Sequence, residues 1–202
     1  MDHYRGTWIM MGHNHIITGV CALEHVYVVD TLIRRSDSSL LLRGLDIVYD
    51  KLGIVMPPAA WKDMQVHMLL IFLAVYIIGV LFPDVDNPNS MLGKVIHVPV
   101  EHRTWIHAIY LYTASFIMGM AIHPVFLWFT FGVFVHLIWD SFSKMGNCWF
   151  YKLLSDYRRY PGGAKIKKGH HLVLYKAGEW TEYLVTFIVV ALTVASFIWI
   201  RR

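Results

Sequence analysis

Histidine and aspartate side chains, which commonly bind transition metals, gather in four short stretches of an otherwise apolar chain, at residues 12–15, 84–86, 102–107 and 136–140. The candidate ligands are His13, His15, Asp84, Asp86, His102, His107, His136 and Asp140. Mixed imidazole and carboxylate ligands suit zinc, and also manganese or iron, whereas calcium and magnesium sites usually use oxygen alone. The residue types therefore predict a divalent metal site, with zinc as the first candidate.

The spacing of these residues adds to the prediction but leaves simpler interpretations open. His136 and Asp140 are four apart, so on a helix they share a face and could reach one ion. Taken alone, such a pair in an apolar helix is more often a hydrogen-bonded polar pair. Asp84 and Asp86 alone could form a turn or a helix cap. Six or more ligands are many for one tetrahedral ion, so two ions would use the set more naturally.

The elements that must position these residues are apolar segments long enough for a membrane. The 202 residues are 56% hydrophobic and only 16% charged, which leaves too little polar surface for a soluble globule. A helix needs about 20 mostly apolar residues to cross a bilayer. Segments 64–82 and 182–200 meet this requirement, and segment 105–139, interrupted at His123-Pro124, predicts a helical hairpin with two crossings.

A further helix is expected at 7–29, buried inside the bundle because polar residues interrupt it, and a helix lying in the membrane interface is expected at about 40–55. We therefore predict an all-α, polytopic membrane helix bundle with about five membrane helices, forming a single domain over residues 1–202.

Crossing parity brings the four ligand stretches to one membrane face. If each segment crosses once, the starts of the first, third and fifth helices share a face with the ends of the second and fourth. The same face carries more than half of the 18 Lys and Arg residues, which favours the cytoplasmic side. Glu182, at the start of the fifth segment, could complete the site or merely cap its helix, since an acidic side chain is favourable in the first turn of a helix. The basic stretch before it suits lipid headgroups, and no nucleic-acid partner is expected.

Three motifs in this order resemble the YdjM-like family of inner-membrane-associated metal-dependent hydrolases. The family's Leu-Pro-Asp-x-Asp element is similar to residues 81–86, its His-Arg-Gly-x-Thr-His-Ser element to residues 102–108, and its His-x-x-x-Asp element to residues 136–140. In the second element, residues 104, 106 and 108 depart from the family's glycine, threonine and serine. The departing residues are Thr104, Ile106 and Ala108. These departures predict altered surroundings for the flanking histidines.

The resemblance and the ligand types together predict an enzyme of a bacterial-type inner membrane. The expected reaction is hydrolysis of a phosphoester, such as a phospholipid headgroup, by metal-activated water, with Asp84 or Asp86 as the catalytic carboxylate and Arg103 binding the anionic substrate. Membrane lipids are the expected partners. The alternative is a non-enzymatic protein, either a metal-stabilised membrane scaffold or a divalent-ion carrier. A carrier is less favoured because few polar residues, mainly Glu24 and His25, continue below the site.

Overall fold

The computed structural model describes residues 5–36, 66–100, 102–143, 147, 149, 157–159, 165–167 and 179–201. Its elements in chain order are α1 (Arg5–Arg35), α4 (Val66–Leu81), η2 (Phe82–Asp86), η3 (Ile109–Tyr112), α5 (Thr113–Ala121), α6 (Val125–Ser141), β1 (Tyr157–Arg159), β2 (Lys165–Lys167) and α7 (Trp180–Arg201). Strands β1 and β2 form a short antiparallel pair, with Tyr157 opposite Lys167. The prediction of an all-α membrane bundle is confirmed, while the interfacial helix expected at about 40–55 lies outside the described residues.

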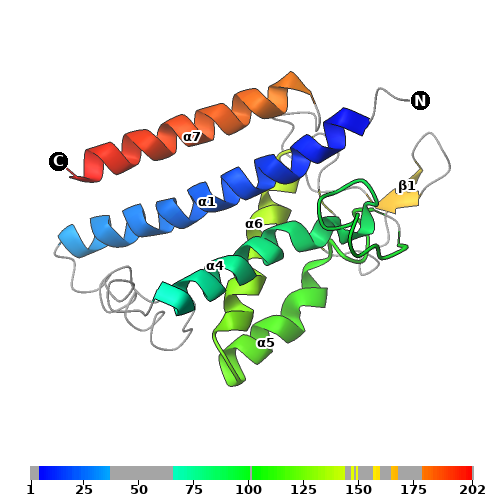
Figure 1. Ribbon diagram of the computed structural model, residues 1–202, viewed down its shortest axis with the longest axis horizontal. Helices are drawn as coiled ribbons and strands as arrows, with labels where there is room; N and C mark the ends of the chain where they lie inside the picture. Colours follow the sequence, from blue (N-terminus) through cyan, green and yellow to red (C-terminus); the bar gives the residue numbers. More distant parts are fainter. Residues whose placement is uncertain are drawn as a thin grey trace.

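Three helical segments of the described chain are long and apolar enough to cross a membrane. They are Gly12–Arg35 within α1, Val66–Asp86 comprising α4 and η2, and Trp180–Ile200 within α7. In Figure 1, α1 and α7 lie side by side and run in the same direction, and α4 runs opposite to α1. The chain is therefore a membrane protein whose longest helices are aligned in one bundle.

The expected hairpin is present between these helices, but its arms are shorter than predicted. The first arm, Ile109–Ala121, spans about 20 Å at helical rise, whereas a crossing requires roughly 30 Å. It begins at Ile109 rather than Trp105 because residues 102–107 form turns instead of helix. Its second arm, α6, returns to the same face, so the hairpin keeps the parity that the sequence predicted.

Helices α4 and α6 touch through their backbones, because each has a glycine at the crossing point. A Cβ atom on Gly79 would lie 2.2 Å from the carbonyl oxygen of Phe129, and one on Gly132 would lie 2.2 Å from that of Tyr76. Small residues allow this close approach between membrane helices. The contact fixes the end of α4, and with it η2, against α6.

A buried aromatic cluster below this crossing joins α1 to the pair. Phe72 and Trp128 stack with ring centroids 5.7 Å apart, and Tyr76 packs edge-on against Trp128. The hydroxyl of Tyr76 donates to the carbonyl oxygen of Gly19 at 2.7 Å. The three helices α1, α4 and α6 are thereby held in a fixed arrangement, and their polar ends meet at one end of the bundle.

Candidate metal centre

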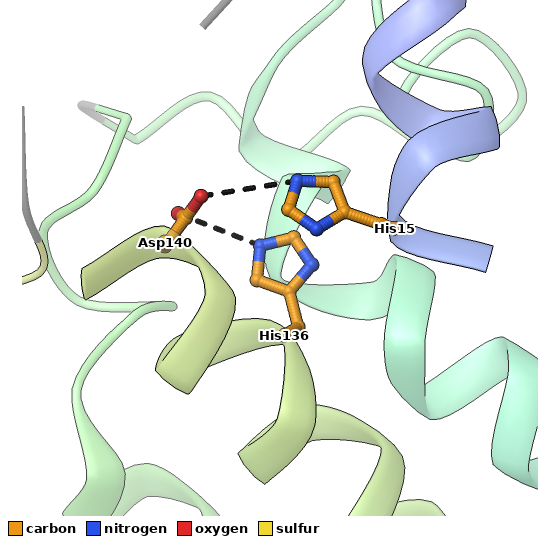
Figure 2. Close-up of side chains that lie close together, drawn as sticks. All are labelled: His15, His136 and Asp140. Atoms are coloured by element: carbon orange, nitrogen blue, oxygen red, sulfur yellow. Dashed lines mark ion pairs between the residues drawn. The ribbon is translucent and has the colours of Figure 1, made fainter. Parts of the chain in front are cut away.

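Two groups of three side chains at this end of the bundle could each hold a metal ion. The first comprises His15 from α1 with His136 and Asp140 from α6, and the second comprises Asp84 from η2 with His102 and His107 from the turns before η3. Within each group the ligand atoms lie within 4.8 Å of one another. Figure 2 shows the rings of His15 and His136 both directed toward the Asp140 carboxylate. Segments far apart in the sequence thus converge on one small volume.

The backbone of α4 orients His136. Its Nδ1 atom donates to the carbonyl oxygen of Val80 at 2.7 Å, which assigns a proton to Nδ1 and directs Nε2 into the cluster. That Nε2 atom lies 3.6 Å from Asp140 Oδ2 and 3.9 Å from Asp84 Oδ1, and it has no hydrogen-bond partner among the described residues. The close contact of α4 with α6 therefore directs the Nε2 atom of His136 between two carboxylates.

Asp86 lies behind both histidines of the turn, with a hydrogen bond to His102 and a longer contact to His107. Its Oδ1 atom accepts a hydrogen bond from Nδ1 of His102 at 2.7 Å, and its Oδ2 atom lies 3.4 Å from Nδ1 of His107. The backbone N–H of Arg103 also donates to Oδ2 at 3.3 Å. Arg103 has a φ of 61°, in the left-handed region, which is uncommon for a residue with a side chain. Asp86 thus braces the histidines, as carboxylates commonly do behind metal ligands.

His107 is fully buried, and its second nitrogen faces the same two carboxylates as His136. Its Nε2 atom lies 3.4 Å from Asp140 Oδ2 and 4.0 Å from Asp84 Oδ1. Burial by itself would lower the pKa of His107, but the neighbouring carboxylates of Asp140 and Asp86 outweigh it and raise the pKa to about 9. In the metal-free protein the imidazole of His107 is therefore the positively charged imidazolium at neutral pH, with a proton on each ring nitrogen.

Asp140 is the shared anion of the cluster. Its Oδ1 atom accepts a hydrogen bond from Nη2 of Arg103 at 2.9 Å, and Arg103 Nη1 donates to Ser143 Oγ at 2.7 Å. The other carboxylate oxygen, Oδ2, is buried and has no hydrogen-bond partner among the described residues. Arg103 thus compensates the charge of Asp140 while leaving one of its oxygens available as a ligand.

The donor set fits a divalent metal better than it fits a hydrogen-bonded polar cluster. Two atoms that bind one tetrahedral zinc ion lie about 3.4 Å apart, given metal–ligand distances near 2.1 Å. The separations between the histidine Nε2 atoms and the carboxylates run from 3.4 to 4.0 Å, close to or above that spacing and too long for good hydrogen bonds. Buried polar atoms are rarely left without partners, so the Nε2 atoms of His107 and His136, which have no close hydrogen-bond partner among the described residues, could hold a ligand between them.

Three of the candidate metal ligands predicted from the sequence lie outside both groups. His13 has an exposed side chain, whereas His15, two residues on, is buried and stacks on His136 with ring centroids 4.1 Å apart. Asp86 lies behind the histidines. Glu182 is buried and accepts a hydrogen bond from Asn14 Nδ2 at 2.9 Å, so it fastens α7 to α1 beside His15.

Some of the groups that orient the site were not selected by sequence reasoning. The Val80 carbonyl belongs to the backbone, and no side-chain pattern predicts which carbonyl a histidine will reach. Asn14 could have been found, since it is an amide beside a candidate ligand in an apolar helix. The departing residues Thr104, Ile106 and Ala108 are all buried, and the hydroxyl of Tyr112 donates to the Ile106 carbonyl.

Comparison with known proteins gives one family match. A family model described as YdjM inner membrane protein matches residues 52–202. No curated protein matches the chain, and no solved structure matches it. The match includes Asp84, His102, His107, His136 and Asp140, and it begins after His15. The contribution of α1 to the cluster therefore comes from the geometry of this chain alone.

Proposed function

The chain belongs to the YdjM inner membrane protein family, and we propose that it is a metal-dependent hydrolase that cleaves a phosphoester at the membrane surface. The observation that carries the proposal is the convergence of His107 and His136. Both present their Nε2 atoms to the Asp84 and Asp140 carboxylates at 3.4–4.0 Å, and their Nδ1 atoms face the Asp86 carboxylate and the Val80 carbonyl. Such an arrangement is typical of metal ligands supported from behind.

The residues that would hold metal are the two groups described above, Asp84 with His102 and His107, and His15 with His136 and Asp140. A bound divalent ion would acidify water and polarise phosphoryl oxygens, and two ions together suit an in-line displacement at phosphorus. Zinc is the first candidate for the mixed ligand set. The excess of Lys and Arg that crossing parity predicts for this face favours the cytoplasmic side of the membrane.

The solvent exposure of each side chain suggests its role in the reaction. The side chain of Asp84 is 12% exposed and that of His102 is 28% exposed, while those of His107, His136 and Asp140 are almost fully buried. Substrate and water would therefore approach past His102 and Asp84. In hydrolysis, a bond forms between the water oxygen and phosphorus, the ester P–O bond breaks, and a proton passes to the leaving oxygen. Asp84, as the more exposed of the two carboxylates, would take the proton from water.

Arg103 would also support the cluster from within. Arg103 is only 5% exposed, and its guanidinium donates hydrogen bonds to Asp140 and Ser143. It would hold the Asp140 carboxylate in the geometry that the ligands need. Contact with an anionic substrate stays a prediction.

A structural metal site is the second candidate, because the ligands come from the ends of α1, η2, the following turns and α6. An ion bound between these segments would fasten the polar ends of the bundle together, and structural metals contribute directly to folding stability. A structural site would use the same ligands, but it would not require a path for a substrate to reach the metal.

Metal analysis combined with a substrate panel separates the two candidates. The protein is purified in detergent, bound metal is measured by plasma mass spectrometry, and cleavage of phosphodiesters and phospholipids is assayed with and without chelator. Asp84→Asn preserves shape but removes the charge, and His13→Ala is a control because its side chain is exposed. We expect stoichiometric metal, and cleavage that chelation and Asp84→Asn abolish but His13→Ala does not.

Three other results would contradict the proposal. Stoichiometric metal without cleavage of any substrate in the panel would remove the enzyme reading. Unfolding on chelation, measured by thermal denaturation and accompanied by no activity, would support the structural site. Absence of metal would remove the premise of both.

A further inference from the structure

A groove lies between the two arms of the hairpin, next to the metal cluster but outside it. Its volume is about 340 Å³. The residues that define it are Ile109, Tyr112, Thr113 and Phe116 from η3 and α5, and Leu127 and Leu137 from α6. The groove lies between two apolar helices, Ile109–Ala121 and Val125–Ser141, which are shorter than the three candidate membrane spans.

The length and depth of the groove match one leaflet of a bilayer. From Leu127 to Leu137 the wall formed by α6 spans ten helical rises, or about 15 Å, which is half of a hydrocarbon core of roughly 30 Å. Its upper end is level with the cluster, because Leu137 follows the ligand His136 and Ile109 lies two residues after His107. Its lower end lies near the turn of the hairpin. The groove therefore runs from the level of the ligands to about the middle of the membrane.

The lining offers hardly any free hydrogen-bonding group to an occupant. The Tyr112 hydroxyl donates to the carbonyl of Ile106, and the Thr130 hydroxyl donates to that of Phe126. A polar ligand would lose its hydrogen bonds to water there without replacing them. Phe116 and Phe134, which also line the groove, are 38% and 41% exposed, so the groove is open to its surroundings. At this depth those surroundings are lipid chains.

One end of the groove shares a wall with the metal cluster. Tyr112 and Leu137 pack in one buried group with Phe82, whose ring meets that of Tyr112 edge-on at 6.3 Å between centroids. Phe82 begins η2, the segment that carries Asp84. An occupant of the groove would therefore emerge beside the segment that carries the most solvent-accessible carboxylate of the cluster.

We propose that this hairpin groove binds one acyl chain of a phospholipid from the leaflet on the side of the metal cluster. This inference rests on the proposed hydrolase and names its substrate class, a membrane phospholipid. With its chain in the groove, the lipid has its phosphate at the membrane surface, at the level of Asp84 and His102. A soluble phosphoester has no use for an apolar groove of this depth.

A tryptophan placed at the groove tests the proposal, with a matched tryptophan one turn away. Thr113→Trp puts an indole into the groove from α5, and Ile117→Trp puts the same group on the same helix at a position that is 58% exposed and does not line the groove. If the first variant does not fold, Val133→Leu narrows the groove from α6. Folding is checked by size-exclusion chromatography in detergent.

Retention of dipalmitoyl phosphatidylethanolamine is measured by native mass spectrometry, independently of catalysis. We expect wild type and Ile117→Trp to keep a mass increment of one phospholipid and Thr113→Trp to lose it. Equal retention in Thr113→Trp and wild type would overturn the groove assignment.

Turnover then tests the link to the proposed hydrolase. We expect the ratio of phosphatidylethanolamine cleavage to bis(para-nitrophenyl) phosphate cleavage to fall in Thr113→Trp and to be unchanged in Ile117→Trp. A ratio that stays constant in Thr113→Trp would overturn the substrate class. If neither compound is cleaved by wild type while the retention differs as expected, the hydrolase is refuted and the lipid-binding groove stands.

Discussion

The close contact between α4 and α6 gives a prediction that reaches the metal cluster without altering a ligand. In Gly132→Ala, the new Cβ atom would lie 2.2 Å from the Tyr76 carbonyl oxygen and 2.8 Å from the Val80 amide nitrogen. To relieve the clash, the helices must separate by roughly 1 Å, because non-bonded atoms attract best near 3.5–4 Å and repel strongly at such short range. We expect overpacking of this kind to cost about 1–3 kcal/mol of folding free energy.

The substitution should also weaken metal binding, although it alters no ligand. Helix α4 carries both the Val80 carbonyl that orients His136 and the η2 segment with Asp84. Metal–ligand distances are reproduced to about 0.2 Å in well-formed sites, so a shift of roughly 1 Å should weaken metal binding about 10–100-fold. Isothermal titration of the metal-free protein in detergent measures the change.

Gly119→Ala is the matched control for this substitution. Its Cβ atom would lie 2.4 Å from Leu127 Cγ, so it also overpacks a helix contact, but at the turn of the hairpin away from the cluster. It should lower the midpoint of thermal unfolding and leave metal affinity unchanged. Unchanged metal affinity in a folded Gly132→Ala protein, or an equal loss in Gly119→Ala, would refute the reasoning.

Three further predictions concern the ligands themselves. His15→Ala should lower the bound metal measured by plasma mass spectrometry, whereas His13→Ala should not, because only His15 is buried against the cluster; equal loss would contradict this assignment. Asp140→Asn removes the carboxylate charge that pairs with the buried Arg103 guanidinium, and loss of a buried ion pair costs about 3–5 kcal/mol, so the midpoint of thermal unfolding should fall; an unchanged midpoint would count against the ion pair. Because the pKa of His107 is raised to about 9 and a bound ion must displace that proton, metal affinity should increase as the pH rises toward 9. Titrations at several pH values would show a flat profile if His107 is not a ligand.

The convergence of the ligands could be predicted because it depends on the order of apolar and polar segments. Each apolar segment must reverse the direction of the chain, so the parity of crossings brings residues 15, 84, 107 and 140 to one face whatever the details of packing. The hairpin illustrates this: its first arm is too short for a full crossing, yet α6 still returns to the correct side. The fold class and the shared location of the ligand stretches follow from hydropathy.

The roles of the individual ligands could not be predicted in the same way. Asp84 and Asp86 are equivalent in sequence, but one faces the cluster and the other braces His102 and His107, because the 3-10 turn of η2 and the left-handed conformation of Arg103 set their directions. His13 and His15 also differ in role only because the side of α1 that carries His15 packs on α6. Such choices depend on backbone contacts made between segments, which no spacing within one segment reveals.

The two ligand groups also differ in how much of the chain must be in place before each can form. Asp84, His102 and His107 belong to one stretch of sequence, so this group needs only that stretch to reach its turns at the membrane surface. The other group joins His15 of the first helix to His136 and Asp140 of the hairpin. It cannot exist until the hairpin has entered the membrane and α6 has packed beside α1. During synthesis, the first group can therefore form early, whereas the second forms only after the helix bundle has been assembled.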